Sequence, residues 1–443
     1  MEYTVLCGSI DTEITTLVYD SRKVEKGSAF VCISGTVRDA HDFIPEVVEK
    51  GAAVVIVEKN VELLPGVTYI KVDNSRKALA YLSAAYFGYP AEHIKTIGIT
   101  GTKGKTTTTY MVKSILDGAG IKTGLIGTIE TIIGDEHIPS ANTTPESFIV
   151  QKYFRKMVDA GLDAVVMEVS SQALMLDRVA GFVFDIGVFT NLEPDHIGEN
   201  EHKDFADYMH CKSLLFQQCN IGIFNGDSEH LDGILKGHTC KVLTFGYGSS
   251  NDLRAEKVEL LKDNGALGVK YHVAGMADFD VEVNVPGTFS VYNSLTAIAI
   301  CEQFAVPTEK IKSTLKNVHV KGRIELVPVS PHYTIMIDYA HNAMALESLL
   351  TTLREYEPGR LVCVFGCGGN RAKSRRYEMG EVSSRLADLT VVTSDNPRNE
   401  EPMDIIADIL IGVKKQSGAY VTIPDRKEAI AYCMKNAKEG DII

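Results

Sequence analysis

The residues best suited to chemistry in this chain form a glycine-rich turn that ends in Gly104-Lys105-Thr106-Thr107. The turn begins at Gly98, directly after a short β-branched run. Glycines let backbone N–H groups approach phosphate oxygens closely, and a helix that starts near Lys105 points its positive N-terminal dipole at the same place. Lys105 adds a full positive charge, and the Thr106 hydroxyl can bind a phosphate-associated Mg²⁺. The pattern predicts a polyphosphate-binding loop, although Ile99 stands where the common motif has its first glycine.

A second group of polar residues follows apolar runs further along the chain. Glu168 ends one such run, and the segment Asn191–His196 follows another. In parallel sheets the carboxyl ends of neighbouring strands face a common ligand crevice, so we expect Glu168 and His196 to bind Mg²⁺ near the phosphate loop. A zinc set of His196, His202 and His210 is an alternative, but its spacing matches no familiar zinc site and the nearby carboxylates suit a hard cation better.

The composition bounds the class of protein. A chain of 443 residues is expected to form two to four domains, and a net charge of −13 argues against nucleic acid as a partner. The nine cysteines form no C-x-x-C pair, which fits reduced thiols in a cytoplasm. No apolar run is long enough to span a membrane, and the N-terminus does not resemble an export signal. We therefore expect a cytoplasmic protein without membrane insertion. We also expect it to act as a monomer.

Strands and helices must alternate to position these residues, and their pattern predicts an α/β protein of three domains. Residues 1–92 carry short strands and end in a helix over 75–87. Residues 93–325 contain strands that are apolar on both faces and alternate with helices, which predicts a largely parallel sheet covered on both sides. Residues 326–443 restart the alternation and predict a smaller doubly wound, Rossmann-like domain.

The motifs together resemble the Mur ligases, which build the peptide of bacterial cell-wall precursors. The resemblance covers essentially the whole chain in the expected order. It is carried by Gly98–Thr107, Glu168–Ser171, Asn191–His196, Tyr208–Phe216, Asn225-Gly226-Asp227, Pro286-Gly287 with Tyr292-Asn293-Ser294, Gly322-Arg323 with Glu325, and Asp338–Asn342. Within the family, Asp20-Ser21-Arg22, Asn142–Pro145, Gly366–Arg371 and Asp395–Arg398 resemble the member that adds the third residue of the peptide.

The resemblance implies ATP-dependent amide bond formation through an acyl phosphate. The D-Glu carboxylate of UDP-MurNAc-L-Ala-D-Glu would be joined to a diamino acid, with ADP and phosphate as products. The three domains would then be an N-terminal substrate domain, a central ATP-binding domain and a C-terminal amino-acid-binding domain.

The resemblance also assigns roles in the ATP site. Two Mg²⁺ ions would be held by Thr106, Glu168, His196 and Lys212, the last of these carbamylated by carbon dioxide. Lys105, Lys212, Glu168 and His196 would be catalytic. The remaining ATP contacts would be Gly101, Thr102, Lys103, Gly104, Thr107, Asn225, Asp227, Arg323, Asp338 and His341.

Two further sets of residues would bind the substrates to be joined. The UDP-sugar peptide would contact Ser21, Thr36, Asn142, Thr143, Thr144, Ser170 and Arg178. The incoming amino acid would contact Arg371, Asp395, Asn396, Pro397 and Arg398. In the family an arginine at the place of Arg398 accompanies meso-diaminopimelate, because its guanidinium can pair with the distal carboxylate.

The end of the chain leaves more than one function open. The chain ends at Ile443, within an expected strand, whereas family members continue through another loop. The expectation is therefore a truncated C-terminal domain, or a homologue that binds its substrates but has lost part of the acceptor site. The same motifs also fit a lysine-adding member of the family and a folylpolyglutamate-synthase-like ligase, although the latter enzymes lack a segment like residues 1–92.

Overall fold

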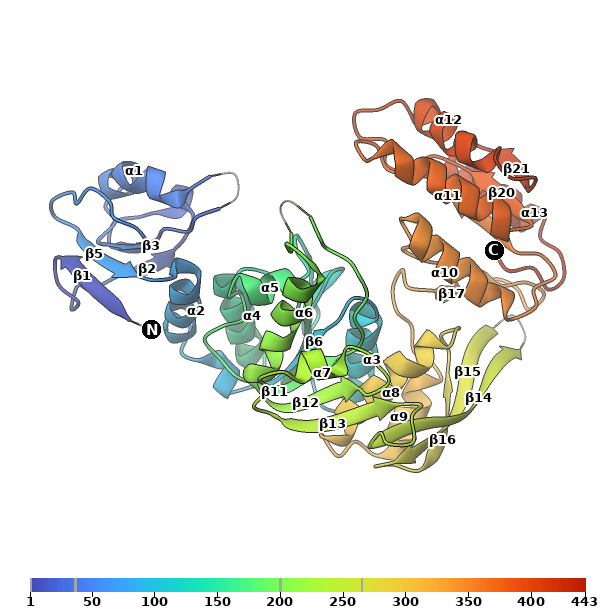
Figure 1. Ribbon diagram of the computed structural model, residues 1–443, viewed down its shortest axis with the longest axis horizontal. Helices are drawn as coiled ribbons and strands as arrows, with labels where there is room; N and C mark the ends of the chain where they lie inside the picture. The colour runs from blue at the N-terminus through green and yellow to red at the C-terminus, as the bar shows by residue number, and fades with distance from the viewer. Residues whose placement is uncertain (1, 36–37, 199–200, 264–265) are drawn as a thin grey trace. The chain divides into compact units, whose positions relative to one another are not determined.

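The computed structural model describes residues 2–35, 38–198, 201–263 and 266–443. It contains two compact units, Met1–Asp252 with Thr296–Val306, and Leu253–Leu295 with Pro307–Ile443. Figure 1 shows their elements coloured along the chain from blue to red. The predicted domain boundaries at residues 92/93 and 325/326 stay predictions. Among the described residues, none of the helices combines the length and the apolar character needed to cross a membrane.

The first unit begins with a five-stranded sheet of order β1-β5-β4-β3-β2, in which only β1 is antiparallel to its neighbour. On β4, Val55 and Val57 join one apolar cluster while Val54 and Ile56 join another, so alternate side chains bury both faces. The bounds are β1 (Tyr3–Cys7), β2 (Thr16–Val18), β3 (Ser28–Val31), β4 (Val54–Val57), β5 (Thr68–Val72), α1 (Ile44–Glu49) and α2 (Ser75–Tyr86).

The same unit contains the larger sheet, with the order β13-β12-β11-β6-β10-β7-β8-β9. Its strands from β13 to β7 are parallel, and β8 and β9 extend it as an antiparallel edge. The prediction of a largely parallel sheet is confirmed here. The strands are β6 (Lys95–Thr100), β7 (Thr123–Ile126), β8 (Glu130–Ile133), β9 (Glu136–Pro139), β10 (Ala164–Glu168), β11 (Phe184–Phe189), β12 (Cys219–Asn225) and β13 (Lys241–Gly246).

Helices alternate with these parallel strands, as the predicted α/β class requires. They are α3 (Lys105–Gly118), α4 (Ser147–Asp159), α5 (Ser171–Met175), α6 (Phe205–Ser213) and α7 (Leu231–Leu235). Register places Glu168 beside Ile99 and Phe189 beside Thr100, so β10, β6 and β11 end at one edge of the sheet. The polar residues that follow these strands are therefore brought together, which is the basis of the site described below.

The second unit opens with an antiparallel meander that the sequence analysis did not anticipate. Its order is β16-β15-β14, and the strands are β14 (Leu253–Asp263), β15 (Ala266–Gly275) and β16 (Phe279–Val283). It is followed by α8 (Phe289–Glu302), which contains residues of both units, α9 (Thr308–Leu315), and the antiparallel pair β17 (Glu325–Val327) and β18 (Ile335–Ile337).

The rest of the second unit alternates helices with the parallel strands β19, β20 and β21. The elements are α10 (Ala343–Arg354), β19 (Val362–Phe365), α11 (Lys373–Leu386), β20 (Leu389–Val392), α12 (Pro402–Val413), β21 (Ala419–Thr422) and α13 (Arg426–Lys435). Ile442 forms parallel bridges to both Thr334 and Leu361. The segment before α10 thus meets this sheet through the last residues of the chain, and not by pairing with β19.

Candidate active site

The glycine-rich turn joins β6 to α3, as predicted. Gly101 has a φ of +151°, and a Cβ there would lie 2.0 Å from Thr190 Oγ1, so only glycine fits this close approach. Gly104 adopts a left-handed conformation and precedes the first residue of α3, Lys105. Lys105 Nζ donates to the carbonyls of Gly101 and Thr102 at 2.8 and 3.0 Å. Its ammonium group therefore lies over the turn, at the positive end of α3.

Asn191, which follows β11, fixes the middle of this turn. Its side chain accepts from Lys103 N at 2.8 Å and donates to Lys103 O at 3.0 Å. Thr190 Oγ1 donates to the same carbonyl at 2.8 Å. The Lys103 side chain extends outward to an exposed ion pair with Glu193. The loop is thus held in shape from β11 before any phosphate is bound.

Glu168 ends β10 and is buried against the start of α3. Its Oε2 accepts from Thr106 Oγ1 at 3.0 Å, which brings together two residues predicted to bind Mg²⁺. Thr128, just after β7, donates to the same carboxylate through its backbone N at 2.8 Å and its Oγ1 at 3.0 Å. A Cβ on Gly127 would lie 2.6 Å from Glu168 Oε1, so a glycine is also needed at that position. The carboxylate is therefore fixed from three sides.

Lys212 on α6 is one of the largest fully buried side chains in the described part of the chain. Its Nζ donates to Gly101 O at 2.9 Å, the same carbonyl that Lys105 contacts, and lies 4.5 Å from the centroid of the Tyr208 ring. Burial, and then the charge of Lys105, lower the pKa of Lys212 well below its ordinary value. The structure therefore favours the neutral amine at this position.

Tyr208 lies between the turn and the loop that carries His196. Its hydroxyl is 3.1 Å from Thr102 Oγ1, and burial raises the pKa of that hydroxyl to about 12. The His196 ring is 6.2 Å from the Tyr208 ring, centroid to centroid. His196 itself is exposed, and its Nδ1 pairs with Glu201 at 3.0 Å. The structure thus places His196 near the turn without a contact to Glu168 among the described hydrogen bonds and ion pairs.

Asn225 is the last residue of β12 and Asp227 follows it, level with the ends of β6 and β11. Asn225 Nδ2 donates to Thr190 O at 2.8 Å. Asp227 accepts from the backbone of Tyr247 and Gly248 and from Asn251 Nδ2. Both side chains therefore order loops beside the glycine-rich turn, and their predicted contacts with ATP stay predictions.

The residues predicted to bind the sugar-nucleotide peptide lie in two places in the first unit. Thr143 Oγ1 is 3.1 Å from Thr128 Oγ1, and Thr144 Oγ1 donates to Glu168 O at 2.8 Å, so both adjoin the Glu168 site. Ser170 caps α5, and Arg178 donates to Thr144 O and pairs with Glu146. Asn142 is exposed, Ser21 begins a short 3-10 helix, and Thr36 lies outside the described residues.

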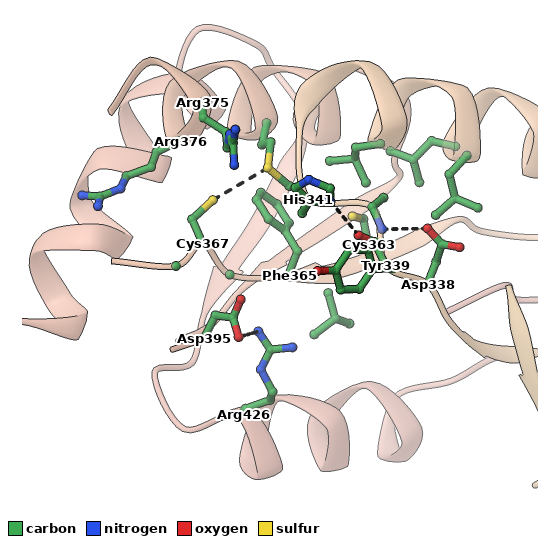
Figure 2. A pocket seen from close by; sticks show the side chains of 18 of the residues that line it. Asp338, Tyr339, His341, Cys363, Phe365, Cys367, Arg375, Arg376, Asp395 and Arg426 are labelled. Carbon is green, nitrogen blue, oxygen red and sulfur yellow. Dashed lines mark hydrogen bonds and ion pairs between the residues drawn. The ribbon is translucent and has the colours of Figure 1, made fainter. Parts of the chain in front are cut away.

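In the second unit, most of the predicted acceptor residues line one cavity of about 670 Å³ (Figure 2). Arg371, Asp395, Asn396 and Arg398 all line it, together with Asp338 and His341. Pro397 is not among the lining residues. A Cβ on Gly369 would lie 1.9 Å from the carbonyl oxygen of Pro397, which explains why residue 369 is a glycine.

Arginines dominate the charge of this cavity. Arg375 and Arg426, which were not among the predicted site residues, line it too. Arg426 faces Asp395 (Figure 2), and the nitrogen and oxygen of this ion pair are 3.8 Å apart. Arg376 is buried and paired with Glu400 and Asp408. A positively charged cavity of this kind suits a ligand with carboxylate groups.

Arg323 and the segment Asp338–His341 form a separate contact in the same unit. The Arg323 guanidinium lies 4.7 Å from the Tyr339 ring centroid, and Asp338 accepts from the backbone N of Ile324 and Ala340. His341 is exposed and its Nδ1 is 3.2 Å from Tyr339 O. Arg323 is not among the residues that line the cavity.

The first unit therefore has the donors that ATP and Mg²⁺ require. The turn and the start of α3 suit a polyphosphate, and the oxygens of Thr106 and Glu168 suit a hard cation. Thr128 and Thr190 were not predicted as site residues, and Asn191 and Tyr208 were named only within the motifs that carry the resemblance. Thr128 could have been found, because it follows β7 just as Glu168 ends β10.

Comparisons with known proteins agree with this picture. Three family descriptions match in order: "Mur ligase family, catalytic domain" at 13–87, "Mur ligase middle domain" at 99–301 and "Mur ligase, glutamate ligase domain" at 322–443. The chain is 43% identical over 446 residues to UDP-N-acetylmuramoyl-L-alanyl-D-glutamate--2,6-diaminopimelate ligase 1 of Clostridium acetobutylicum, covering 100% of this chain and 91% of the relative.

Two further proteins extend the comparison. The UDP-N-acetylmuramoyl-L-alanyl-D-glutamate--2,6-diaminopimelate ligase of Clostridium perfringens is 42% identical over 450 residues, which cover 100% of this chain and 91% of the relative. A solved UDP-N-acetylmuramoyl-L-alanyl-D-glutamate--2,6-diaminopimelate ligase superposes with a TM-score of 0.75 at 25% identity, covering 98% of this chain and 90% of that one.

Proposed function

The chain belongs to the Mur ligase family, and we propose that it joins 2,6-diaminopimelate to the D-Glu carboxylate of UDP-MurNAc-L-Ala-D-Glu with consumption of ATP. Relatives named for that activity match over the full length of the chain. The observation that best supports the chemistry is the meeting of Lys105, Lys212 and the Thr106–Glu168 pair around one phosphate-binding turn.

The reaction needs help because a carboxylate is a poor electrophile and repels the triphosphate that must activate it. Two unit charges 4 Å apart repel by about 4 kcal/mol at an effective dielectric of 20. Transfer of the γ-phosphoryl group to the carboxylate oxygen gives an acyl phosphate, and attack by the amine of the diamino acid then releases phosphate. In this proposal Lys105 and the N-terminus of α3 stabilise the charge that develops during the first step.

Thr106 and Glu168 would hold the Mg²⁺ of the nucleotide, and carbamylated Lys212, Glu168 and His196 a second Mg²⁺. These ions would supply positive charge between the two anionic reactants. Carbamylation requires a neutral amine, and burial lowers the pKa of Lys212 in the direction that favours this form. His196 lies in a loop, whereas Glu168 ends β10, and this part of the proposal rests on the family resemblance.

The second unit would select the acceptor. Arg398 and Arg371 line the cavity, and a bidentate guanidinium–carboxylate pair would distinguish diaminopimelate from lysine, which lacks the distal carboxylate. Asp395 and Asn396 line the same cavity and would orient the amino groups. We further propose that the enzyme acts as a cytoplasmic monomer, where its nine free cysteines stay reduced.

The test is a phosphate-release assay with ATP, Mg²⁺ and bicarbonate. We expect phosphate release that requires both UDP-MurNAc-L-Ala-D-Glu and meso-diaminopimelate, with mass spectrometry detecting the tripeptide product. L-Lysine, in place of diaminopimelate, tests for a lysine-adding enzyme, and a folate substrate with glutamate tests for a folylpolyglutamate synthase. Tight ATP binding without any ligated product would support a homologue that binds but does not catalyse.

A further inference from the structure

Three side chains that play no part in the proposed reaction meet beside α6. They are His202, Asp207 and Cys211, and the ligand atoms of the three lie within 4.8 Å of one another. His202 and Cys211 are buried, whereas Asp207 is partly exposed. Within the described part of the chain this is the one group of three or more His, Cys, Asp or Glu side chains gathered closely enough to hold a metal ion.

The local structure explains why the three meet. Asp207 and Cys211 are four residues apart on α6, so they lie on one face of the helix, one turn from each other. His202 lies in the segment before α6, where its backbone N donates to His196 O at 3.0 Å. Its ring reaches Asp207 Oδ2 through Nδ1 at 3.1 Å.

We propose that His202 Nδ1, Asp207 Oδ2 and Cys211 Sγ form a binding site for one Zn²⁺-like cation, with water as the fourth ligand. Imidazole, thiolate and carboxylate are the zinc ligands found in proteins, and a thiolate discriminates against the hard cation Mg²⁺. The site is therefore chemically distinct from the Thr106–Glu168 site, which offers oxygen donors only.

The distances need little adjustment. Zn–N and Zn–O bonds of about 2.1 Å in a tetrahedron separate the two ligand atoms by roughly 3.4 Å, and a Zn–S bond of about 2.3 Å places sulfur roughly 3.6 Å from either. The His202–Asp207 separation of 3.1 Å already matches, and the upper limit of 4.8 Å means that the thiol has to move by about 1 Å at most.

A further contact orients the histidine. His202 Nε2 is 2.8 Å from Ser171 Oγ, at the first residue of α5. In the metal-bound form Nδ1 carries no proton, and Nε2–H donates to the serine hydroxyl, which can accept as well as donate. Such a hydrogen bond to the second ring nitrogen accompanies most metal-bound histidines and fixes the ring. In the metal-bound form the ring proton is on Nε2, and the Cys211 thiol proton has been released to solvent, with no change in oxidation state.

The test uses the full-length protein, stripped of metal and reduced, without nucleotide or bicarbonate. Co²⁺ serves as the spectroscopic probe, because thiolate ligation gives a sulfur-to-cobalt charge-transfer band, and Zn²⁺ is then titrated against it. We expect one Co²⁺ per chain with that band, and its loss when one equivalent of Zn²⁺ is added. Absence of the band in the parent protein overturns the proposal.

The variants separate ligation from folding. Cys211→Ser should abolish the band and weaken Zn²⁺ binding at least 10-fold, and Asp207→Asn should weaken it as well. Ser171→Ala should weaken it by about 10–100-fold, the usual effect of losing a histidine-orienting partner. His210→Gln, one residue from Cys211 on the exposed face of α6, and Cys7→Ser on β1 are matched controls that should change nothing.

Circular dichroism of each metal-free variant establishes that it is folded. If Cys211→Ser fails to fold, the partly exposed Asp207→Asn still tests the site. A charge-transfer band that persists in folded Cys211→Ser, or that is lost in His210→Gln or Cys7→Ser but kept in Asp207→Asn, refutes the assignment.

Discussion

Thr128 provides the sharpest test of how the Glu168 carboxylate is positioned. The substitution Thr128→Val keeps the shape of the side chain and the backbone N–H that donates to Glu168 at 2.8 Å, and removes only the Oγ1 donor at 3.0 Å. Thr128 Oγ1 is also 3.1 Å from Thr143 Oγ1. Since one hydroxyl donates a single proton, we take Thr128 to donate to the carboxylate and to accept from Thr143.

The expected magnitude follows from the charge on the acceptor. A hydrogen bond to a charged group contributes about 1.5–3 kcal/mol, which corresponds to roughly a 10- to 150-fold change in an equilibrium or rate constant. The carboxylate is buried, so water does not readily replace the lost donor. We expect the Mg²⁺ concentration for half-maximal activity to rise by about 10–100-fold, in the range seen when a partner that orients a metal ligand is lost.

The assay is phosphate release as a function of Mg²⁺ at saturating ATP and substrates. Thr128→Ser restores the hydroxyl and should recover most of the Mg²⁺ dependence of the parent. Thr131→Val on β8 is the matched control, because Thr131 is buried nearby and makes no hydrogen bond with Glu168 in the described part of the chain. Unchanged Mg²⁺ dependence in folded Thr128→Val, or an equal loss in Thr131→Val, would refute the reasoning.

Four other predictions concern Lys105, Lys212 and Arg398. Lys105→Ala should abolish turnover while the thermal midpoint changes little, because the lost charge faces the phosphates; turnover within about tenfold of the parent contradicts this role. Lys212→Ala should lose activity and regain part of it with short carboxylates. In carbon dioxide-free buffer, the folded parent binds fewer protons at Lys212 than the unfolded chain does. The difference in free energy of unfolding between the parent and Lys212→Met should therefore increase with pH, from the lowered pKa of Lys212 up to about 10.5. The slope should be at most about 1.4 kcal/mol per pH unit. A difference that does not change with pH would contradict the lowered pKa. Arg398→Ala should reduce a preference for meso-diaminopimelate over L-lysine by about tenfold or more, measured as the ratio of kcat/KM values; an unchanged ratio shows that Arg398 does not bind the distal carboxylate.

The parallel sheets could be predicted because their strands are short apolar runs bounded by polar residues. The apolar run that Glu168 ends is the strand Ala164–Glu168, and the carboxyl-end rule then predicted Glu168 beside the phosphate turn. The meander β14–β16 could not be found in the same way. Leu253–Asp263 carries charged residues along most of its length, so it shows no continuous apolar run.

Partners within the site were harder to predict than the motif residues. Asn191 and Thr190 act through a backbone carbonyl of the turn, and such a contact leaves no spacing pattern in the sequence. Arg375 and Arg426 come from the starts of α11 and α13, and only the folded second unit brings them to one cavity. The residues that chemistry requires were predictable by type, whereas the residues that hold them in place depend on tertiary contacts.

The burial of Lys212 shows how the fold prepares a residue whose sequence context gives little sign of its role. Lys105 and Lys212 donate to the same Gly101 carbonyl, so their nitrogens lie less than about 6 Å apart. Two ammonium groups at that distance repel by roughly 3 kcal/mol at an effective dielectric of 20, and burial adds to the cost of the second charge. Lys212 is enclosed, and its burial, together with the charge of Lys105, lowers the pKa of Lys212 well below its ordinary value. A carbamate formed there would be negative, and the repulsion between the two residues would become an attraction. In our proposal, the contact with Gly101 that brings Lys212 beside Lys105 would then hold the carbamate at the turn where we expect phosphate to bind.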